Sequence, residues 1–127
     1  MTYLTDLYSA LAGDTAITAS VSNRIYLDIA PSTTAAPFLV YQVISTRSTT
    51  LHNRTRNLEF PSIQFSCWAK TKLEAVNLAN SVLFLLDGCQ PIGTSEISFV
   101  FSNQSGDYES DTKLFGERVE LSGVCKK

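Results

Sequence analysis

The sequence predicts an α+β domain in which a mainly antiparallel β-sheet carries two α-helices packed on one face and includes a long β-hairpin. The spacing of apolar residues changes along the chain and gives the order helix, strands, helix, strands. Successive strands follow one another without the crossover helices that parallel strands require, so the sheet is expected to be mainly antiparallel. A chain of 127 residues suits one core, and we expect a single domain over residues 1–127.

Two segments have the periodicity of amphipathic helices. The first ends at Gly13 and carries an apolar stripe at Leu4, Leu7, Tyr8 and Leu11. Ile17 and Val21 predict a further turn after it. The second begins with a capping box, in which the Thr71 hydroxyl accepts from the third helical amide and Glu74 reaches back. Its expected apolar face is Leu73, Val76, Ala79 or Asn80, Leu83 and Leu86, and Asp87-Gly88 ends it.

Strand segments are rich in β-branched and aromatic residues or alternate between apolar and polar residues. They cover residues 24–27, 38–44, 62–68, 97–102 and 115–122. The polar segment Thr46–Asn57 is expected to be the loop of the long hairpin, and Asn103–Thr112 a second polar turn region. A loop as long as the first is uncommon inside a compact domain, and such loops are usually functional or ordered by a partner.

The composition excludes several classes of protein. With 44% hydrophobic and 17% charged residues, the chain is an ordinary globular one. Its net charge of -2 lacks the basic excess of nucleic-acid binders, so no sequence-specific nucleic acid is expected. No apolar run approaches the ~20 residues that span a bilayer, so no membrane partner is expected. Three cysteines without Cys-x-x-Cys spacing, and an N-terminus unlike a signal peptide, favour reduced thiols in a cytoplasmic product.

The sequence offers no evident nucleophilic site. Such a site needs a base beside its nucleophile. The only histidine, His52, lies in the polar loop, whereas Cys67 lies in the middle of a strand on the same face as its apolar residues. Free cysteine is among the most buried residue types, so Cys67 is expected to be a structural thiol.

An acidic alternation, Asp107, Glu109 and Asp111, is similar to the start of a calcium loop. Counted from Asp107, the sixth position is Thr112 where glycine is needed, and the twelfth is Arg118 where a bidentate glutamate is needed. The calcium interpretation therefore fails. We expect no catalytic, cofactor-binding or metal-binding residues, and no cofactor.

Two groups of charged residues remain, and each taken alone is typical of a solvated surface. The hairpin carries the basic group, Arg47, His52, Arg54 and Arg56. The later turn region carries the acidic group, Asp107, Glu109 and Asp111. Complementary patches of this kind can set the register of a head-to-tail assembly. These residues are therefore the candidates for a subunit or tube interface.

An ordered set of short segments spans nearly the whole chain. The set comprises the helix Leu4–Leu11, Arg24-Ile25-Tyr26, Pro31, Pro37 to Gln42, Cys67-Trp68-Ala69, the helix with Glu74-Ala75 and Ala79, and Asp107-Tyr108 to Asp111-Thr112. In this order the segments resemble the family of small phage tail-completion and tail-terminator proteins. No single segment is specific, and the resemblance rests on the ordered set.

The resemblance implies a structural virion protein and not an enzyme. Such a protein forms a ring, commonly of six copies, that caps the head-proximal end of a tail tube and presents a surface to the head connector. The implied partners are further copies of the chain, the tail tube protein and the head-tail connector protein, and DNA can pass through the lumen of the ring. The implied location is the virion tail, after assembly in the host bacterial cytoplasm.

The family has no catalytic residues to carry over, and its long hairpin, here 46–57, often takes part in ring contacts. Within the same class the chain could instead be a head-tail adaptor or another tube-end protein. From a different class, it could be a small ligand-binding or cysteine-dependent α+β enzyme. A pocket joining His52 and Cys67 would favour the last of these.

Overall fold

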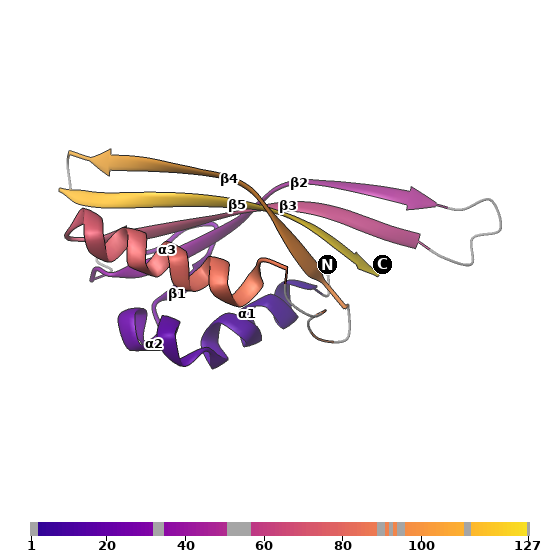
Figure 1. The fold of residues 1–127 in the computed structure, drawn as a ribbon, viewed down its shortest axis with the longest axis horizontal. Coiled ribbons are helices and arrows are strands. Elements are labelled where there is room, and N and C mark those ends of the chain that lie inside the picture. Colours follow the sequence, from indigo (N-terminus) through magenta and orange to yellow (C-terminus); the bar gives the residue numbers. More distant parts are fainter. Residues whose placement is uncertain are drawn as a thin grey trace.

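The computed structural model describes residues 3–31, 35–50, 57–88, 91, 93, 96–110 and 113–126. Within these residues, helices pack on one face of a five-stranded sheet, which confirms the predicted α+β class (Figure 1). The helices are α1 (Tyr3–Gly13), α2 (Thr15–Val21) and α3 (Lys72–Leu86). The strands are β1 (Ile25–Leu27), β2 (Phe38–Thr50), β3 (Asn57–Ala69), β4 (Ser98–Glu109) and β5 (Leu114–Lys126).

The sheet has the strand order β1-β2-β3-β5-β4. β1 pairs with β2 in parallel, and all other neighbours are antiparallel. β2–β3 and β4–β5 are antiparallel pairs of consecutive strands, and the described ends of β2 and β4 lie toward opposite ends of the molecule's long axis (Figure 1). The helices lie below the middle of the sheet and below the half in which β4 ends and β5 begins, so the far half of the β2–β3 hairpin extends past them (Figure 1).

Both predicted polar loops are shorter than the sequence indicates. β2 continues through Thr50 and β3 starts at Asn57, so only residues 51–56 of the first loop fall outside these strands. Likewise β4 continues through Glu109, where a turn was predicted from Asn103 onward. In both places the partner strand supplies the backbone hydrogen bonds, so polar side chains do not end the strand.

Side-chain caps start two of the helices. Asp14 is the N-cap of α2, and its Oδ2 accepts from the amide of Ile17 at 3.1 Å. This is the further turn predicted around Ile17, which brings the helices on this face to three among the described residues. Thr71 caps α3 as predicted, with Oγ1 3.2 Å from the amide of Glu74. No helix among the described segments is long and apolar enough to cross a membrane.

The predicted buried face of α3 is wrong at its start. Leu73 is 69% exposed, and Val76 and Leu83 are only partly buried. The residues that reach the sheet are Ala75, Leu78, Ala79, Val82 and Leu86. The helix is apolar on most sides, so two overlapping stripes fit its sequence, and packing selects the one with small alanines against the strands.

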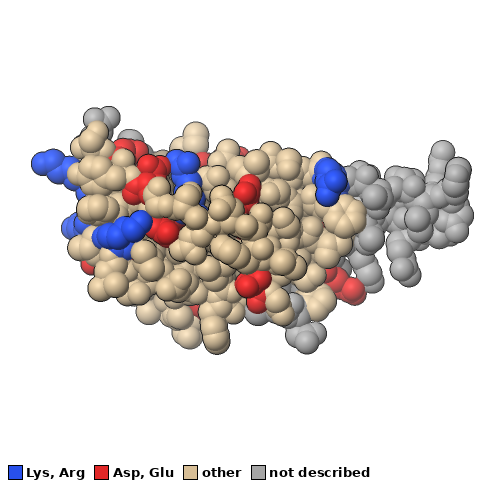
Figure 2. All heavy atoms as spheres, turned by 45° about the horizontal axis from the view of Figure 1, so that its top comes forward, with Lys and Arg blue, Asp and Glu red and all other residues tan. Residues whose placement is uncertain are grey.

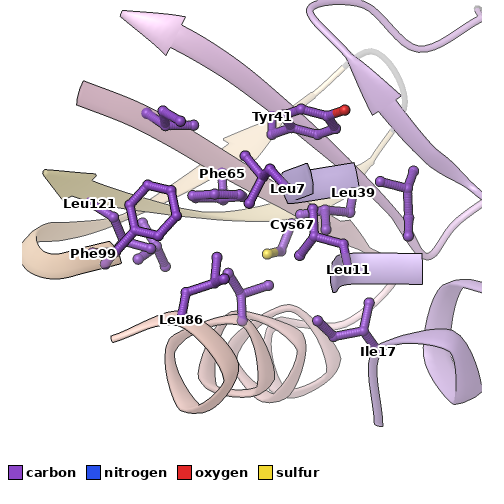
Figure 3. Packing of buried hydrophobic residues seen from close by; sticks show 14 of the residues in the cluster. Leu7, Leu11, Ile17, Leu39, Tyr41, Phe65, Cys67, Leu86, Phe99 and Leu121 are labelled. Carbon is purple, nitrogen blue, oxygen red and sulfur yellow. The ribbon is translucent and has the colours of Figure 1, made fainter. Parts of the chain in front are cut away.

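The core lies between the helices and the sheet (Figure 3). At its centre Phe65 on β3 stacks on Tyr41 of β2, with ring centroids 6.3 Å apart. It also meets the edge of Phe99 on β4 at 6.4 Å. Cys67, two residues further along β3, points its sulfur into the space between the sheet and α3 (Figure 3). The core therefore joins β2, β3 and β4 to the helical layer through one aromatic row.

Cys67 is fully buried and free, as is Cys125 with 2% exposure. Burial raises the pKa of the Cys67 thiol, with a smaller contribution from nearby Glu117. Burial also raises the pKa of Cys125. Both thiols therefore stay protonated and unreactive at neutral pH. The third cysteine, Cys89, lies outside the described residues.

Replacement of Cys67 by alanine is expected to lower the free energy of unfolding by about 1 kcal/mol, through the packing lost around the deleted sulfur. Chemical denaturation of the purified chain measures this. Assembly into particles should be unchanged. A native disulfide found by mass mapping under non-reducing conditions would contradict the structural role.

Candidate functional site

One face of the sheet has no covering element among the described residues. Side chains alternate along β3 accordingly. Phe65 and Cys67 are buried between the sheet and the helices, whereas Gln64 and Ser66 on the other face are partly exposed. Figure 2 brings this uncovered face forward, and uncharged side chains occupy most of its middle. An antiparallel sheet commonly has one solvated face. This face carries apolar as well as polar side chains, which suits contact with another protein.

A groove of about 490 Å³ lies on the uncovered face. It crosses β2, β3 and β5 and is bordered by the segment after β1, by the end of β4 and by the start of β5. Its lining residues are Asp28, Ile29, Ala30, Pro31, Phe38, Val40, Gln42, Gln64, Ser66, Trp68, Glu109, Leu114 and Arg118. The lining mixes apolar surface with hydrogen-bonding groups, as protein-binding surfaces do.

Trp68 extends over the neighbouring strand because its partner there is glycine. Trp68 pairs with Gly116 across β3 and β5. A Cβ built at Gly116 would lie 2.8 Å from Cζ3 of the indole, closer than atoms can pack. Gly116 therefore allows the ring to lie flat against β5, where it forms part of the groove wall.

A valine at Gly116 is expected to displace the Trp68 ring and to lower the free energy of unfolding by about 1 to 2 kcal/mol, because overpacked sites force side chains off their preferred rotamers. Denaturation and tryptophan fluorescence of Gly116→Val measure the two effects. Trp68 is the only tryptophan, so the spectrum reports this site alone. An unchanged emission maximum would contradict the packing.

A buried charged network ties the start of α3 to the sheet. The Glu117 carboxylate, on the helix side of β5, accepts hydrogen bonds from Lys72 Nζ at 2.6 Å and from Gln104 Nε2 at 3.0 Å. Glu117 is 6% exposed and is the one buried charged residue among those described. Gly106 on β4 leaves room for the Lys72 ammonium group, because a Cβ at Gly106 would lie too close to Lys72 Nζ.

Sequence reasoning missed this network. The available signal was the position of Glu117, two residues before Val119 and four before Leu121 on the buried face of an alternating strand. A charge at such a position needs a partner, because an unpaired buried carboxylate is costly. The sequence does not say which cation reaches it.

The acidic group is partly neutralised within the subunit. Asp107 Oδ2 lies 2.6 Å from Arg118 Nη2, across β4 and β5 on the uncovered face. Glu109 is exposed at the end of β4 and lines the groove. Asp111 lies outside the described residues. The surface at this end is therefore a mixture of charges, and the predicted acidic patch is weaker than the sequence indicates.

The basic group lies at the other end of the molecule. Arg47 is exposed on β2, opposite Phe60 of β3, in the part of the hairpin that extends past the helices. His52, Arg54 and Arg56 lie outside the described residues. Arg47 lies near the end of β2, and Asp107 and Glu109 lie near the end of β4. These strand ends lie toward opposite ends of the long axis, so one subunit does not bring these three residues together (Figure 1).

The structure gives little support to a cysteine-dependent active site. Cys67 is buried beneath the sheet and does not line the groove, which opens on the other face. Among the described residues, no three His, Cys, Asp or Glu side chains gather in a way that could hold a metal ion. His52, the only histidine of the chain, falls outside those residues.

Comparison with protein families gives the identity. The model of a family described as "Tail completion protein gp17" matches residues 5–124. The chain belongs to this family. It is thus a tail completion protein, a structural component of the phage virion, in agreement with the resemblance found in the sequence.

A solved structure has the same fold as this tail completion protein. It is a chain of the "Virion of native gene transfer agent (GTA) particle". The two chains superpose with a TM-score of 0.75 at 12% sequence identity, over 97% of this chain and 93% of the other. At this identity the likeness concerns the fold alone. No curated protein sequence matches the chain significantly.

Proposed function

We propose that this tail completion protein forms a ring of six copies, the number that the family resemblance implies, and that the ring caps the head-proximal end of the tail tube. The observation that carries the proposal is the placement of complementary groups at opposite ends of one elongated subunit. Arg47 lies on the protruding hairpin, and Asp107 and Glu109 lie beside the turn at the other end. Contacts between unlike surfaces of identical subunits build rings when the rotation closes.

The uncovered sheet face supplies the second surface that this role requires. A capping ring has to contact the tube on one side and the head connector on the other, in addition to its own subunits. The groove and the apolar side chains around Trp68 are available for one of these partners after the ring has formed. The fold shared with a chain of a gene transfer agent virion supports assembly into a multi-subunit particle.

In this proposal the chain has a structural role and no catalytic one. The buried thiol of Cys67 and the mixed lining of the groove offer no nucleophile with a base beside it among the described residues. DNA would pass through the lumen of the ring without sequence-specific contacts, in keeping with the net charge of -2.

Omission of the protein during particle assembly tests the proposed function. Particles made without it are expected to accumulate as separate heads and tails whose tubes lack a defined end. Purified wild-type chain added to these extracts should restore joining. Completed particles in its absence would contradict the proposal, and tails that have a defined end without the chain but do not join heads would favour a head-tail adaptor.

A further inference from the structure

At each edge of the sheet, part of a strand pairs with only one other strand among the described residues. On one edge, β1 pairs with β2 only from Leu39 to Tyr41. The rest of β2, from Gln42 to Thr50, pairs with β3 alone. Its outer backbone groups are therefore available for another strand.

The other edge, β4, is covered only at its start. The amide of Gly88 donates to the Phe99 carbonyl at 3.0 Å, and Asp87 Oδ1 accepts from the Phe101 amide at 2.8 Å. A bulge follows Phe101, and from Asn103 to Glu109 the strand pairs with β5 alone.

The register shows which β4 groups face outward. The Phe101 amide points away from β5, and Phe101 pairs with Leu121. The backbone groups of successive β4 residues point alternately toward β5 and away from it. Counted from Leu121, the β4 partner of every second β5 residue therefore points its backbone groups outward. Beyond the bulge these partners are Gln104, Gly106 and Tyr108.

Both stretches lack two residue types that commonly protect an edge strand. Isolated edges commonly hold lysine or proline, which block pairing with another chain. The stretches Gln42–Thr50 and Asn103–Glu109 contain neither residue. The second also has Tyr108, which is 50% exposed and whose outward amide donates to Asp107 Oδ1 of the same subunit at 2.8 Å. A long edge stretch without lysine or proline can pair with a strand of another chain.

We propose that residues 103–109 of β4 in one copy pair antiparallel with residues 42–50 of β2 in the next copy, so that the sheets join around the ring. This inference rests on the proposed function and names the surfaces that form the subunit contact. β4 runs opposite to β2 within one subunit, because three antiparallel steps separate them. A neighbour that continues the sheet therefore presents β2 in the antiparallel direction.

Charge fixes the register of this contact. With Arg47 opposite Asp107, residues 45–50 of one copy face residues 104–109 of the other, and Arg47 lies near Glu109 as well. Arg118 already holds Asp107 in position on this surface. The two stretches lie toward opposite ends of the long axis, so successive copies are staggered along the strands. A stagger of this kind is also needed to close a sheet into a barrel.

Cross-linking tests the contact directly. Ser45→Cys and Glu109→Cys are combined with Cys89→Ser, so that the remaining native thiols, Cys67 and Cys125, are buried. Tails assembled with this chain are treated with a short bis-maleimide. The double variant is expected to give a ladder of covalent multimers up to the size of the ring. The two single-cysteine variants should give no ladder, because each interface then holds one thiol.

The outcomes separate the contact from the function. Complete rings that yield only monomers after cross-linking would overturn the edge pairing and leave the ring in place. Tails without any ring would overturn the proposed function itself. A dimer from either single variant would show a two-fold contact and also overturn the staggered pairing.

A backbone substitution gives an independent test. Gln104→Pro removes an outward amide, whereas Gln104→Ala keeps the amide and loses the same side-chain hydrogen bond to Glu117 Oε1, 3.0 Å long. The alanine variant is expected to complete tails at nearly the wild-type level and the proline variant at least tenfold less. The melting temperature of each monomer checks folding. If both variants fold and complete tails to the same extent, whatever that extent is, the proposal is overturned. If the proline variant does not fold, the cross-linking experiment decides.

Discussion

Replacement of Lys72 by methionine is expected to lower the free energy of unfolding by about 3 kcal/mol, the lower end of the range for breaking a buried ion pair from one side. Methionine fills the space of the lysine stem but leaves the Glu117 carboxylate buried, with Gln104 as its remaining donor. That donor keeps the loss from being larger. Chemical denaturation of the purified chain measures it.

Two further variants test whether the loss comes from the unpaired carboxylate of Glu117. Glu117→Leu should cost less than Lys72→Met, because Lys72 is half exposed and its ammonium group can turn into water once the carboxylate is gone. The double variant Lys72→Met with Glu117→Leu should recover most of the loss, since no charge then stays buried. Equal losses in both single variants, with no recovery in the double variant, would show that the pair does not act as a unit.

Replacement of Arg47, Arg54 and Arg56 by serine is expected to lower tail completion at least tenfold and to leave the melting temperature of the monomer nearly unchanged. Arg47 is exposed and no described contact within the subunit needs its charge. At an interface, guanidinium groups can bind carboxylates through two hydrogen bonds. A loss of about 1.4 kcal/mol at each contact already changes the association constant tenfold.

Lys70→Ser is the control for loss of charge alone, because Lys70 is an exposed cation beside the start of α3, away from the hairpin. It should leave both tail completion and stability unchanged. If the triple variant instead unfolds the isolated domain, the hairpin belongs to the core of the subunit. The assignment of its arginines to an interface would then be wrong.

Much of the fold follows from local pattern. The alternation of Ile63, Phe65 and Cys67 identified β3, and the Thr71 cap identified the start of α3, because each signal depends on residues close in sequence. The buried face of α3 did not follow, because a helix that is apolar on most sides carries more than one possible stripe. Leu73 is exposed for that reason.

The remainder depends on residues far apart in sequence. The sequence of Asn103–Glu109 by itself predicts a turn. The segment forms a strand because β5 supplies hydrogen-bond partners for its backbone. Similarly, the burial of the Glu117 carboxylate is tolerated because Lys72, from α3, donates a hydrogen bond to it. The interface candidates could be chosen from their charge, but their separation along the long axis, and the Asp107–Arg118 pair, required the structure.

The central claim is that copies of this chain form a closed ring at the head-proximal end of the tail. Imaging of purified tails by electron cryomicroscopy, with and without the chain, tests it most directly. The account predicts one extra ring of identical subunits at that end, with the β2–β3 hairpin of each copy in contact with its neighbour. A chain found as an isolated decoration, or at the opposite end of the tube, would contradict it.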